Sequence, residues 1–360
     1  MKNIPKYVKL KELIKELILN EKLKPGDIIE SENNLSSRFG ISRHTVRQAI
    51  GELVNENWLY REQGKGTFVS HEVGKNNHEK KMIGVMTTYI HDYIFPDIIK
   101  GIDDVLSQKG YSIILGCTNN HQSSERLCLE SMKENNIAGL IAEPVKSALP
   151  NPNLELYKEI IESGIPVIFI NAFYKELDSS FVVEDDFNAG YMATKHLLEL
   201  GHRKIGGIFK VDDMQGHQRY KGYSSAYNEF NLIPNDASVL WFSTEDRQRL
   251  LDNSIPDETF FEHLDGCTAI VCYNDQMAVK LLDYLRTMNI HVPDDISIVS
   301  FDDSSLATVT EVKFTSVAHP KEKLGQKAAL SLLSIIDEQV DHVKEKMNPE
   351  LVIRGSTKAL

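Results

Sequence analysis

The chain has 360 residues, of which 40 are Lys or Arg and 52 are Asp or Glu, so its formal net charge is −12. This length suits two or three domains, and a hydrophobic content of 41% is ordinary for a globular protein. No apolar run approaches the roughly 18 residues that a membrane-spanning helix needs, and the N-terminus lacks the apolar core of a secretory signal. We therefore expect a cytoplasmic protein with no membrane partner.

A polar linker divides the chain. Residues 71–81 contain one apolar residue and show no periodicity, which is typical of a solvated linker. Residues 1–70 hold 12 Lys or Arg and 9 Asp or Glu, a net charge of +3, which leaves −15 for residues 71–360. We predict an N-terminal domain at 1–70, a linker at 71–81 and a C-terminal domain at 82–360, and the N-terminal domain differs in charge from the rest of the chain.

The N-terminal domain is predicted to contain three helices and a hairpin. Apolar residues recur at helical spacing from Tyr7 to Ile18. Ser31 can cap a second helix that ends at Gly40, and Ser42 can cap a third helix that runs to about residue 57. The short segment between the second and third helices is a turn length suited to a helix-turn-helix. Residues 58–69 then predict a β-hairpin with a Gly-Lys-Gly tip.

The third helix has two different faces. On a helical wheel, one stripe is apolar and should face the core, namely Val46, Ala49, Ile50 and Leu53. The opposite side carries basic and amide side chains, namely His44, Arg47 and Gln48, with Arg43 beside them. Arginine can donate two hydrogen bonds to guanine, and glutamine can pair with adenine in the major groove. A solvated polar face is the ordinary alternative, but the short turn and the hairpin favour DNA binding.

Four segments carry a specific resemblance, namely Pro25-Gly26-Asp27, residues 29–32, residues 39–49 and residues 64–69. Residues 5–70 resemble the winged helix-turn-helix of GntR-family bacterial repressors. The resemblance implies double-stranded operator DNA as the partner, contacts from Arg43 and Arg47, and wing-tip glycines in the minor groove, where only a bare backbone fits. The candidate DNA-binding residues are Lys6, Tyr7, Glu30, Ser42, Arg43, His44, Thr45, Arg47, Gln48, Gln63, Gly64, Lys65 and Gly66.

The C-terminal domain alternates apolar strands with amphipathic helices. Strands are predicted at 82–88, 111–117, 138–142, 166–170, 204–209, 239–242, 269–272 and 296–301. Helices are predicted at 95–109, 124–135, 154–163, 189–200, 218–230 and 277–288. This alternation implies parallel sheets, and its restart after residue 185 predicts two α/β lobes with a ligand cleft at the carboxyl ends of their strands.

Polar side chains stand where these strands end. They supply carboxylates, amides and cations, which match the hydroxyl groups of a neutral sugar, and nearby aromatic rings could cover its apolar face. A single strand-end Asp is more often a helix cap, but the recurrence of such groups favours a binding site. Of Asp302 and Asp303, we expect at most one to point into the cleft. The candidate effector-binding residues are Tyr89, Tyr93, Phe95, Glu143, Asn171, Lys210, Arg219, Asn274 and Asp302.

Longer segments resemble the LacI/GalR sensor domain, a two-lobed domain of the type I periplasmic-binding-protein kind, over nearly all of 82–357. They are residues 183–190, 196–205, 219–223, 272–278, 293–303 and 315–317. The resemblance implies effector contacts from Arg219, Asn274 and Asp302. Asn171 stands where the family often has Asp.

The pairing of the two domain types resembles the arabinose-responsive repressors of Gram-positive bacteria, and residues 87–96, 143–148 and 207–210 carry that likeness. It implies L-arabinose as the effector, a homodimer, release from the operator on sugar binding, and a location at the nucleoid. No cofactor is implied.

Two other interpretations remain open at this point. The same architecture could respond to another pentose or sugar, and corepression is not excluded by any residue. A sugar-processing enzyme is disfavoured because the sequence has no G-x-S-x-G, G-x-x-x-x-G-K-[ST] or H-E-x-x-H motif. The cysteines, which form no C-x-x-C pair, are expected to be buried free thiols and not metal ligands, namely Cys117, Cys128, Cys267 and Cys272.

Overall fold

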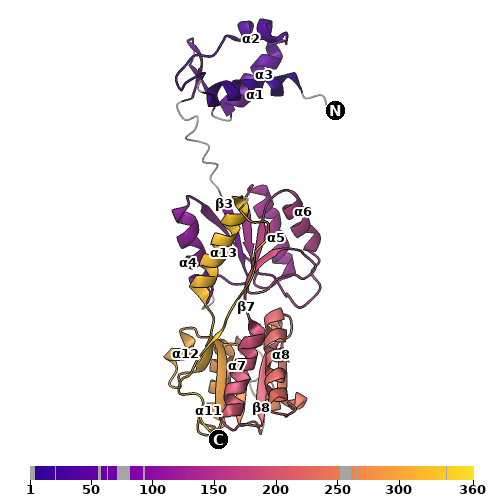
Figure 1. Ribbon diagram of the computed structural model, residues 1–360, viewed down its shortest axis with the longest axis vertical. Coiled ribbons are helices and arrows are strands. Elements are labelled where there is room, and N and C mark those ends of the chain that lie inside the picture. The colour runs from indigo at the N-terminus through magenta and orange to yellow at the C-terminus, as the bar shows by residue number, and fades with distance from the viewer. Residues whose placement is uncertain are drawn as a thin grey trace. The chain divides into compact units, whose positions relative to one another are not determined.

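The computed structural model describes residues 5–20, 22–55, 58–62, 64–70, 82–91, 94–251, 261–264, 266–337 and 339–360 (Figure 1). The chain forms two compact units, residues 1–80 and 81–360, which we call the N-terminal unit and the C-terminal unit. Among the described residues, no helix is long and apolar enough to cross a membrane.

The N-terminal unit contains the predicted helices and hairpin. Its elements are α1 (Lys6–Leu19), α2 (Glu32–Phe39), α3 (Arg43–Asn55), β1 (Leu59–Glu62) and β2 (Gly66–Val69). The two strands are antiparallel. Ser31 and Ser42 accept the backbone amides of Asn34 and Thr45 through their hydroxyl oxygens, so both predicted helix caps are confirmed.

The apolar stripe of α3 forms the centre of this unit. Val46, Ala49, Ile50 and Leu53 are each at most 1% exposed, as predicted, and they pack with the buried face of α1. Burying a side chain of this size stabilises the fold by about 1.5–3 kcal/mol. The core therefore fixes which face of α3 points outward.

The C-terminal unit has two lobes, and each is built on a six-stranded sheet of described residues (Figure 1). The N-terminal lobe contains β3 (Met82–Thr87), α4 (Phe95–Gln108), β4 (Ser112–Cys117), α5 (Gln122–Glu134), β5 (Gly139–Ala142), α6 (Leu154–Glu162), β6 (Val167–Ile170), β7 (Ser180–Glu184), α13 (Lys321–Ile336) and β13 (Lys344–Met347). Its strand order is β13-β7-β6-β5-β3-β4, with all pairs parallel.

The C-terminal lobe contains α7 (Asp186–Glu199), β8 (Ile205–Lys210), α8 (Met214–Glu229), β9 (Val239–Phe242), α9 (Thr244–Leu251), β10 (Ala269–Cys272), α11 (Asp275–Thr287), β11 (Ser297–Asp302), α12 (Leu306–Val309), β12 (Thr315–Ala318) and β14 (Glu350–Val352). Two 3-10 turns, Asp236–Ser238 and Glu262–Leu264, also belong to it. Its strand order is β14-β12-β11-β10-β8-β9, and β14 is antiparallel to β12. Two α/β lobes with largely parallel sheets are therefore confirmed.

Within the described residues, the chain passes between the lobes three times. It does so after β7, after β12 and after β13, so each lobe is built from separated segments. The late helix α13 returns to the N-terminal lobe and lies beside α4 (Figure 1). No helix is predicted there from the sequence, because the buried face of α13 includes small residues, Gly325, Ala328 and Ala329, and gives a weak apolar pattern.

Glycines allow two helix pairs to pack at close range. A Cβ atom at Gly325 of α13 would lie 2.2 Å from the carbonyl oxygen of Ile98 in α4. In the C-terminal lobe, a Cβ atom at Gly222 of α8 would lie 2.0 Å from the carbonyl oxygen of Phe187 in α7. No real Cβ fits at such a distance, so the backbones of each pair can approach only where side chains are missing.

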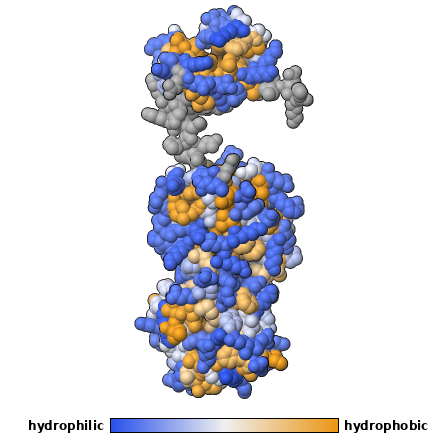
Figure 2. Space-filling model, in the orientation of Figure 1, coloured by the Kyte–Doolittle hydropathy of each residue, from blue (hydrophilic) through white to orange (hydrophobic). Residues whose placement is uncertain are grey.

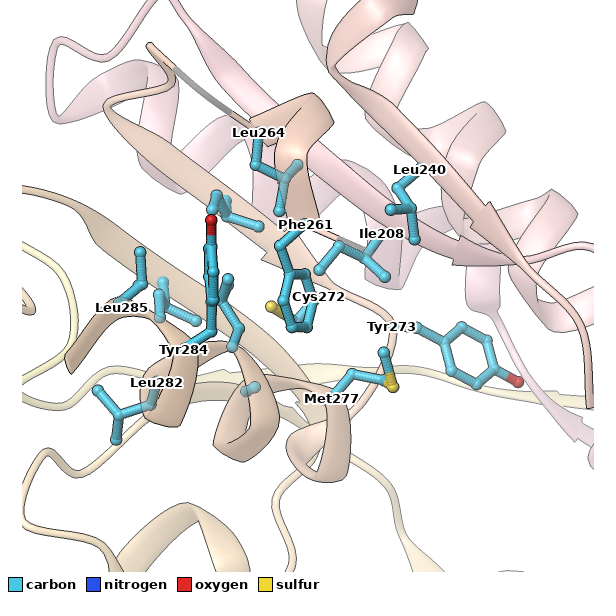
Figure 3. Close-up of a cluster of buried hydrophobic side chains, with 14 of the residues drawn as sticks. Ile208, Leu240, Phe261, Leu264, Cys272, Tyr273, Met277, Leu282, Tyr284 and Leu285 are labelled. Carbon is cyan, nitrogen blue, oxygen red and sulfur yellow. The ribbon is translucent and has the colours of Figure 1, made fainter. Parts of the chain in front are cut away.

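The core of the C-terminal lobe places Tyr273 at its margin. Figure 3 shows Phe261, Cys272 and Met277 packed together, with the hydroxyl end of Tyr273 directed away from them. Cys272 is fully buried, and burial raises the pKa of its thiol. The cysteine prediction is right for Cys272 and wrong in part for Cys117, Cys128 and Cys267, which are free but partly exposed.

The exposure of Cys117 has a simple cause, since this residue ends β4, an edge strand of its sheet.

Among the described residues, no group of His, Cys, Asp and Glu could hold a metal ion. Figure 2 shows one face of the molecule, on which hydrophilic side chains predominate and hydrophobic ones form separate patches.

Candidate functional site

The outward face of α3 is the candidate DNA-reading surface. Arg43, His44, Arg47 and Gln48 are all exposed, as the helical wheel predicts. The Arg47 guanidinium donates to the Glu32 carboxylate of α2, with Nη2 to Oε2 at 3.0 Å and Nε to Oε2 at 3.2 Å. These hydrogen bonds and the charge of Glu32 raise the pKa of Arg47. Glu32 thus orients the guanidinium on the outer face, and an exposed ion pair of this kind is weak enough to exchange for a base contact.

The other candidates around α3 have mixed structural roles. The Ser42 hydroxyl caps the helix and forms a 2.8 Å hydrogen bond with the hydroxyl of Thr45, so these two groups also shape the turn. The Glu30 carboxylate forms an ion pair with Arg38 of α2. Lys6 is exposed at the start of α1, whereas Tyr7 packs partly against the core.

The hairpin tip forms the candidate wing. Gly64 and Gly66 have φ values of +78° and +138°, a region that side-chain-bearing residues rarely adopt. Between them, Lys65 is exposed, and its ammonium lies 2.9 Å from the Glu62 carboxylate. The predicted contact Gln63 lies outside the described residues.

The carboxyl ends of the strands from both lobes meet around a cavity, which we call the interlobe cavity. Every described candidate for effector binding lines it, namely Tyr89, Phe95, Glu143, Asn171, Lys210, Arg219, Asn274 and Asp302. Tyr93 lies outside the described residues. The structure therefore brings together the described side chains that were predicted to bind the effector.

Glu143 and Asn171 form the floor of the cavity in the N-terminal lobe. Oε2 of Glu143 accepts from the backbone amide of Thr88 at 2.7 Å and from its hydroxyl at 2.5 Å. Oε1 accepts from Nδ2 of Asn171 at 2.8 Å. Burial raises the pKa of Glu143, and these hydrogen bonds lower it in part. The carboxyl group is therefore fixed in one orientation.

Arg219 is the central cation of the C-terminal lobe and is almost completely buried. Its Nε donates to Asp186 at 2.8 Å, and its Nη1 donates to the carbonyl oxygen of Tyr273 at 2.7 Å. Its Nη2 lies 3.8 Å from Oδ1 of Asp302 and 3.7 Å from Oε2 of Glu184. Burial raises the pKa of Asp186 to about 6, against the attraction of Arg219. Burial and Asp186 also raise the pKa of Glu184.

Three other strand ends complete the polar wall. Lys210 donates from Nζ to Oδ2 of Asp213 at 2.5 Å. Asn274 caps α11 by accepting the amide of Met277 at 3.0 Å. Asp302 has a φ of +91° and lines the cavity, whereas Asp303 pairs with Arg354 at 2.6 Å. The expectation that at most one of the two acids points into the cleft is confirmed.

Several lining residues were not predicted, namely Thr88, Ile94, Asp213, Gln215, Arg247, Tyr273 and Gln276. Arg247 lies with its guanidinium carbon 4.7 Å from the ring centre of Tyr89, and it donates to Oε1 of Gln276 at 2.6 Å. It belongs to α9, which the sequence pattern did not indicate. Gln276 could have been found, because it directly follows the strand-end pair Asn274-Asp275.

Comparison with known proteins supports both halves of this description. Residues 6–69 match the model of the gntR family of bacterial regulatory proteins, and residues 194–357 match that of the periplasmic binding protein-like domain. The fold is similar to that of a LacI family transcriptional regulator from Enterococcus faecium, solved with bound ribose. The two structures superpose with a TM-score of 0.64 and 26% sequence identity, and the match covers 78% of this chain and 100% of the regulator's chain. The chain is thus a transcriptional regulator with a GntR-type DNA-binding domain and a periplasmic-binding-protein-like sensor.

Full-length relatives are more specific. The chain is 43% identical to the arabinose metabolism transcriptional repressor of Geobacillus stearothermophilus, over 100% of this chain and 99% of the relative. It is 42% identical to the repressor of the same name from Halalkalibacterium halodurans, over 98% and 96%. The chain belongs to the family of arabinose metabolism transcriptional repressors. The predicted family resemblances are confirmed, and the chain belongs with repressors and not with enzymes.

Proposed function

We propose that L-arabinose binds in the interlobe cavity and releases the chain from operator DNA, which it contacts through α3 and the wing. The observation that carries the proposal is the convergence of the strand-end side chains of both lobes on one cavity. A ligand that touches both lobes can change the angle between them, because only the crossings join the lobes covalently.

The charges around the cavity favour a neutral, hydroxylated ligand. Lys210 and Arg219 are matched by Asp213 and Asp186, so neither cation offers an unbalanced charge to an anionic ligand. Carboxylates and amides together accept from and donate to hydroxyl groups, which do both. The relatives' name supports arabinose as that ligand, and the ribose-bound regulator supports a pentose.

Aromatic rings supply the apolar part of the wall. The centres of the Tyr89 and Phe95 rings lie 6.0 Å apart at the edge of the cavity, with their planes tilted by 59°. Such faces can cover the C–H groups of a sugar ring while the polar residues meet its hydroxyls. This division of the wall suits a sugar better than an apolar compound.

Release requires that the sugar prefer one conformation. L-arabinose must bind the operator-incompetent arrangement of the repressor more tightly than the competent one, since equal affinity would shift nothing. In a homodimer, which we also propose, two copies of α3 would meet half-sites about one helical turn apart on a palindromic operator.

The decisive experiment combines calorimetry with an operator gel shift. L-arabinose, D-xylose, D-ribose and D-galactose are titrated against the full chain, and each is then tested for release of operator DNA. We expect binding and release with L-arabinose alone. Release by a different sugar would replace the effector, and tighter operator binding with L-arabinose would show corepression.

A further inference from the structure

We propose that a set of contacts between the lobes, which we call the latch, holds the C-terminal unit closed and sets the affinity for the effector. The latch consists of Asn120, Lys146 and Ser147 from the N-terminal lobe and Asp213, Thr244 and Glu245 from the C-terminal lobe. The inference rests on the proposed function, because it concerns the response to the same effector.

Asn120 is the centre of the latch. It is completely buried, and its Nδ2 group donates across the gap to Oγ1 of Thr244 at 2.7 Å and to Oδ1 of Asp213 at 3.3 Å. Its Oδ1 accepts from the backbone amide of Lys146 at 2.8 Å. One amide group therefore ties two loops of the N-terminal lobe to two segments of the C-terminal lobe. A buried polar group of this kind is costly to leave unpaired, so opening the lobes must overcome it.

Further contacts extend the latch to the rim. The backbone amide of Met214 donates to Oγ of Ser147 at 2.9 Å, and that of Ala148 donates to the carbonyl oxygen of Asp212 at 3.1 Å. On the outside, Nζ of Lys146 lies 2.6 Å from Oε1 of Glu245. Backbone groups of both lobes are thus protected only while the lobes stay together.

The loops that present the latch are held in uncommon conformations. Asn120 has a φ of +57° and Lys146 has a φ of +44°, both in the left-handed region. Neither residue is a glycine, so each backbone carries a conformational cost that its contacts must offset. The hydrogen bond between these two residues joins the strained positions directly.

The latch lies at the sheet edges farthest from the crossings, where opening of the lobes would produce the largest separation. The crossings leave from β7, β12 and β13, which lie toward one end of each strand order. Asn120 follows β4 and Thr244 follows β9, the strands at the opposite edge of their sheets. Rotation about the crossings separates this edge the most, so contacts here resist opening more than contacts near the crossings.

Asp213 connects the latch to the interlobe cavity. Its carboxylate accepts from Asn120 through one oxygen and from the cavity residue Lys210 through the other. A sugar hydroxyl that meets Lys210 therefore acts on a group that also holds the lobes together. The closed arrangement places both walls of the cavity around one molecule, so weakening the latch should weaken effector binding.

The test uses Thr244→Val in the full chain, which keeps the side-chain shape and removes the hydroxyl that Asn120 contacts. The matched control is Thr287→Val, whose hydroxyl donates within the C-terminal lobe to the carbonyl oxygen of Tyr284 at 2.7 Å. Without sugar, hydrogen exchange is followed at the amides of Met214 and Ala148. With sugar, the dissociation constant for L-arabinose is measured by calorimetry.

We expect Thr244→Val to speed exchange at both amides and to raise the dissociation constant about fivefold to tenfold. Thr287→Val should leave both quantities unchanged. Lys146→Met, which removes the ion pairs of Lys146 with Glu245 and Asp212 and leaves Asn120 in place, should give a smaller change in the same direction and serves if Thr244→Val does not fold.

Unchanged exchange, or an unchanged dissociation constant for L-arabinose, in a folded Thr244→Val protein would overturn the latch. If the wild-type chain itself fails to bind L-arabinose, the proposed effector is wrong. The exchange comparison then still decides whether the latch holds the lobes together, so the two failures are distinguishable.

Discussion

At the scale of single residues, a short relay fixes the direction of hydrogen bonding in the cavity floor. Asn171 donates to Glu143 through Nδ2, so its Oδ1 faces Nε2 of His319 at 3.1 Å. His319 must then carry its proton on Nε2. Turning the Asn171 amide over would place its Nδ2 donor against the proton on Nε2 of His319 and its Oδ1 against the Glu143 carboxylate.

This relay makes Glu143→Gln informative. An amide NH₂ in place of Oε1 would meet the Nδ2 donor of Asn171, and in place of Oε2 it would meet the backbone amide of Thr88. We expect affinity for L-arabinose to fall by roughly 1–3 kcal/mol, or about five- to 150-fold. Calorimetry measures it, with Glu130→Gln on the exposed face of α5 as the control. Equal affinities of the two variants for L-arabinose would show that Glu143 does not contribute to effector binding.

The second prediction at this scale concerns Arg47. We expect Arg47→Ala to weaken operator binding by roughly 1–3 kcal/mol and to relax its sequence preference, because a base contact is lost. Gel shifts with the operator and with single-base variants of it measure both effects. Lys22→Ala, which removes an exposed charge outside α3, should change affinity less and leave the preference intact. An unaltered preference in Arg47→Ala would exclude a base contact.

At the scale of elements, close helix pairs brace the two lobes. The α4–α13 pair joins the first helix of the N-terminal lobe to the segment that returns after the second crossing. The close packing of α4 and α13 depends on Gly325. Because α13 also packs on the sheet of the N-terminal lobe, moving the two helices apart would disturb the contacts between α13 and that sheet.

Gly325→Ala should therefore destabilise the C-terminal unit. Its Cβ would overlap the backbone of α4, and overpacking of this kind typically costs about 1–3 kcal/mol. Urea unfolding measures the loss. Leu330→Ala lies on the exposed side of the same helix and should stay within about 0.5 kcal/mol of the wild type. A shift no larger than that of Leu330→Ala would contradict the close packing.

The second crossing predicts a pH dependence. Burial, together with Lys321 and Arg219, lowers the pKa of His319 to about 3, against about 6.5 when unfolded. Between these values the unfolded chain binds a proton that the folded chain does not. This group therefore stabilises the fold fully above pH 6.5, and that contribution is lost as the pH falls toward 3, by about 1.4 kcal/mol per unit.

His319→Gln should remove this dependence. We expect the unfolding free energies of wild type and variant to converge as the pH is lowered from 7 to 5, because only the wild type loses the histidine contribution. Urea unfolding at several pH values measures the difference. Parallel curves would mean that His319 does not stay neutral in the folded chain.

At the scale of the whole molecule, the net charge of −12 is the sum of two parts of the chain with opposite net charges. The N-terminal residues 1–70 carry +3, and several of their cations are paired internally, including Arg47 with Glu32 and Lys65 with Glu62. The acidic remainder should stay away from the phosphate backbone. Affinity for operator DNA should then rest on base contacts and, in the proposed homodimer, on two DNA-binding domains.

Salt dependence tests this division. Four cations belong to the candidate DNA surface, namely Lys6, Arg43, Arg47 and Lys65. If all four contact the DNA, the plot of the logarithm of the binding constant against the logarithm of the salt concentration should have a slope no steeper than about −4 per DNA-binding domain. Gel shifts from 50 to 200 mM salt measure it, with sedimentation to count the copies bound. A slope near −8 per domain would require a far larger basic surface.

The sequence was informative where local chemistry decides the outcome. The stripe of α3 and the caps at Ser31 and Ser42 depend on neighbours a few residues away, and the structure confirms them. The strand-end side chains could be grouped in advance because parallel strands end at the same edge of a sheet.

Tertiary structure alone decided the features that depend on distant segments. α13 packs in the lobe that begins more than 200 residues earlier, since the chain crosses between the lobes, and no local pattern records that. Arg247 reaches Tyr89, and Asn120 reaches Thr244, only because the two lobes close on each other. The sequence by itself determined which side chains stand at strand ends and on the face of α3, through periodicity and capping. The structure decided which of them share a cavity and what holds it closed, because those contacts arise from the crossings and not from sequence spacing.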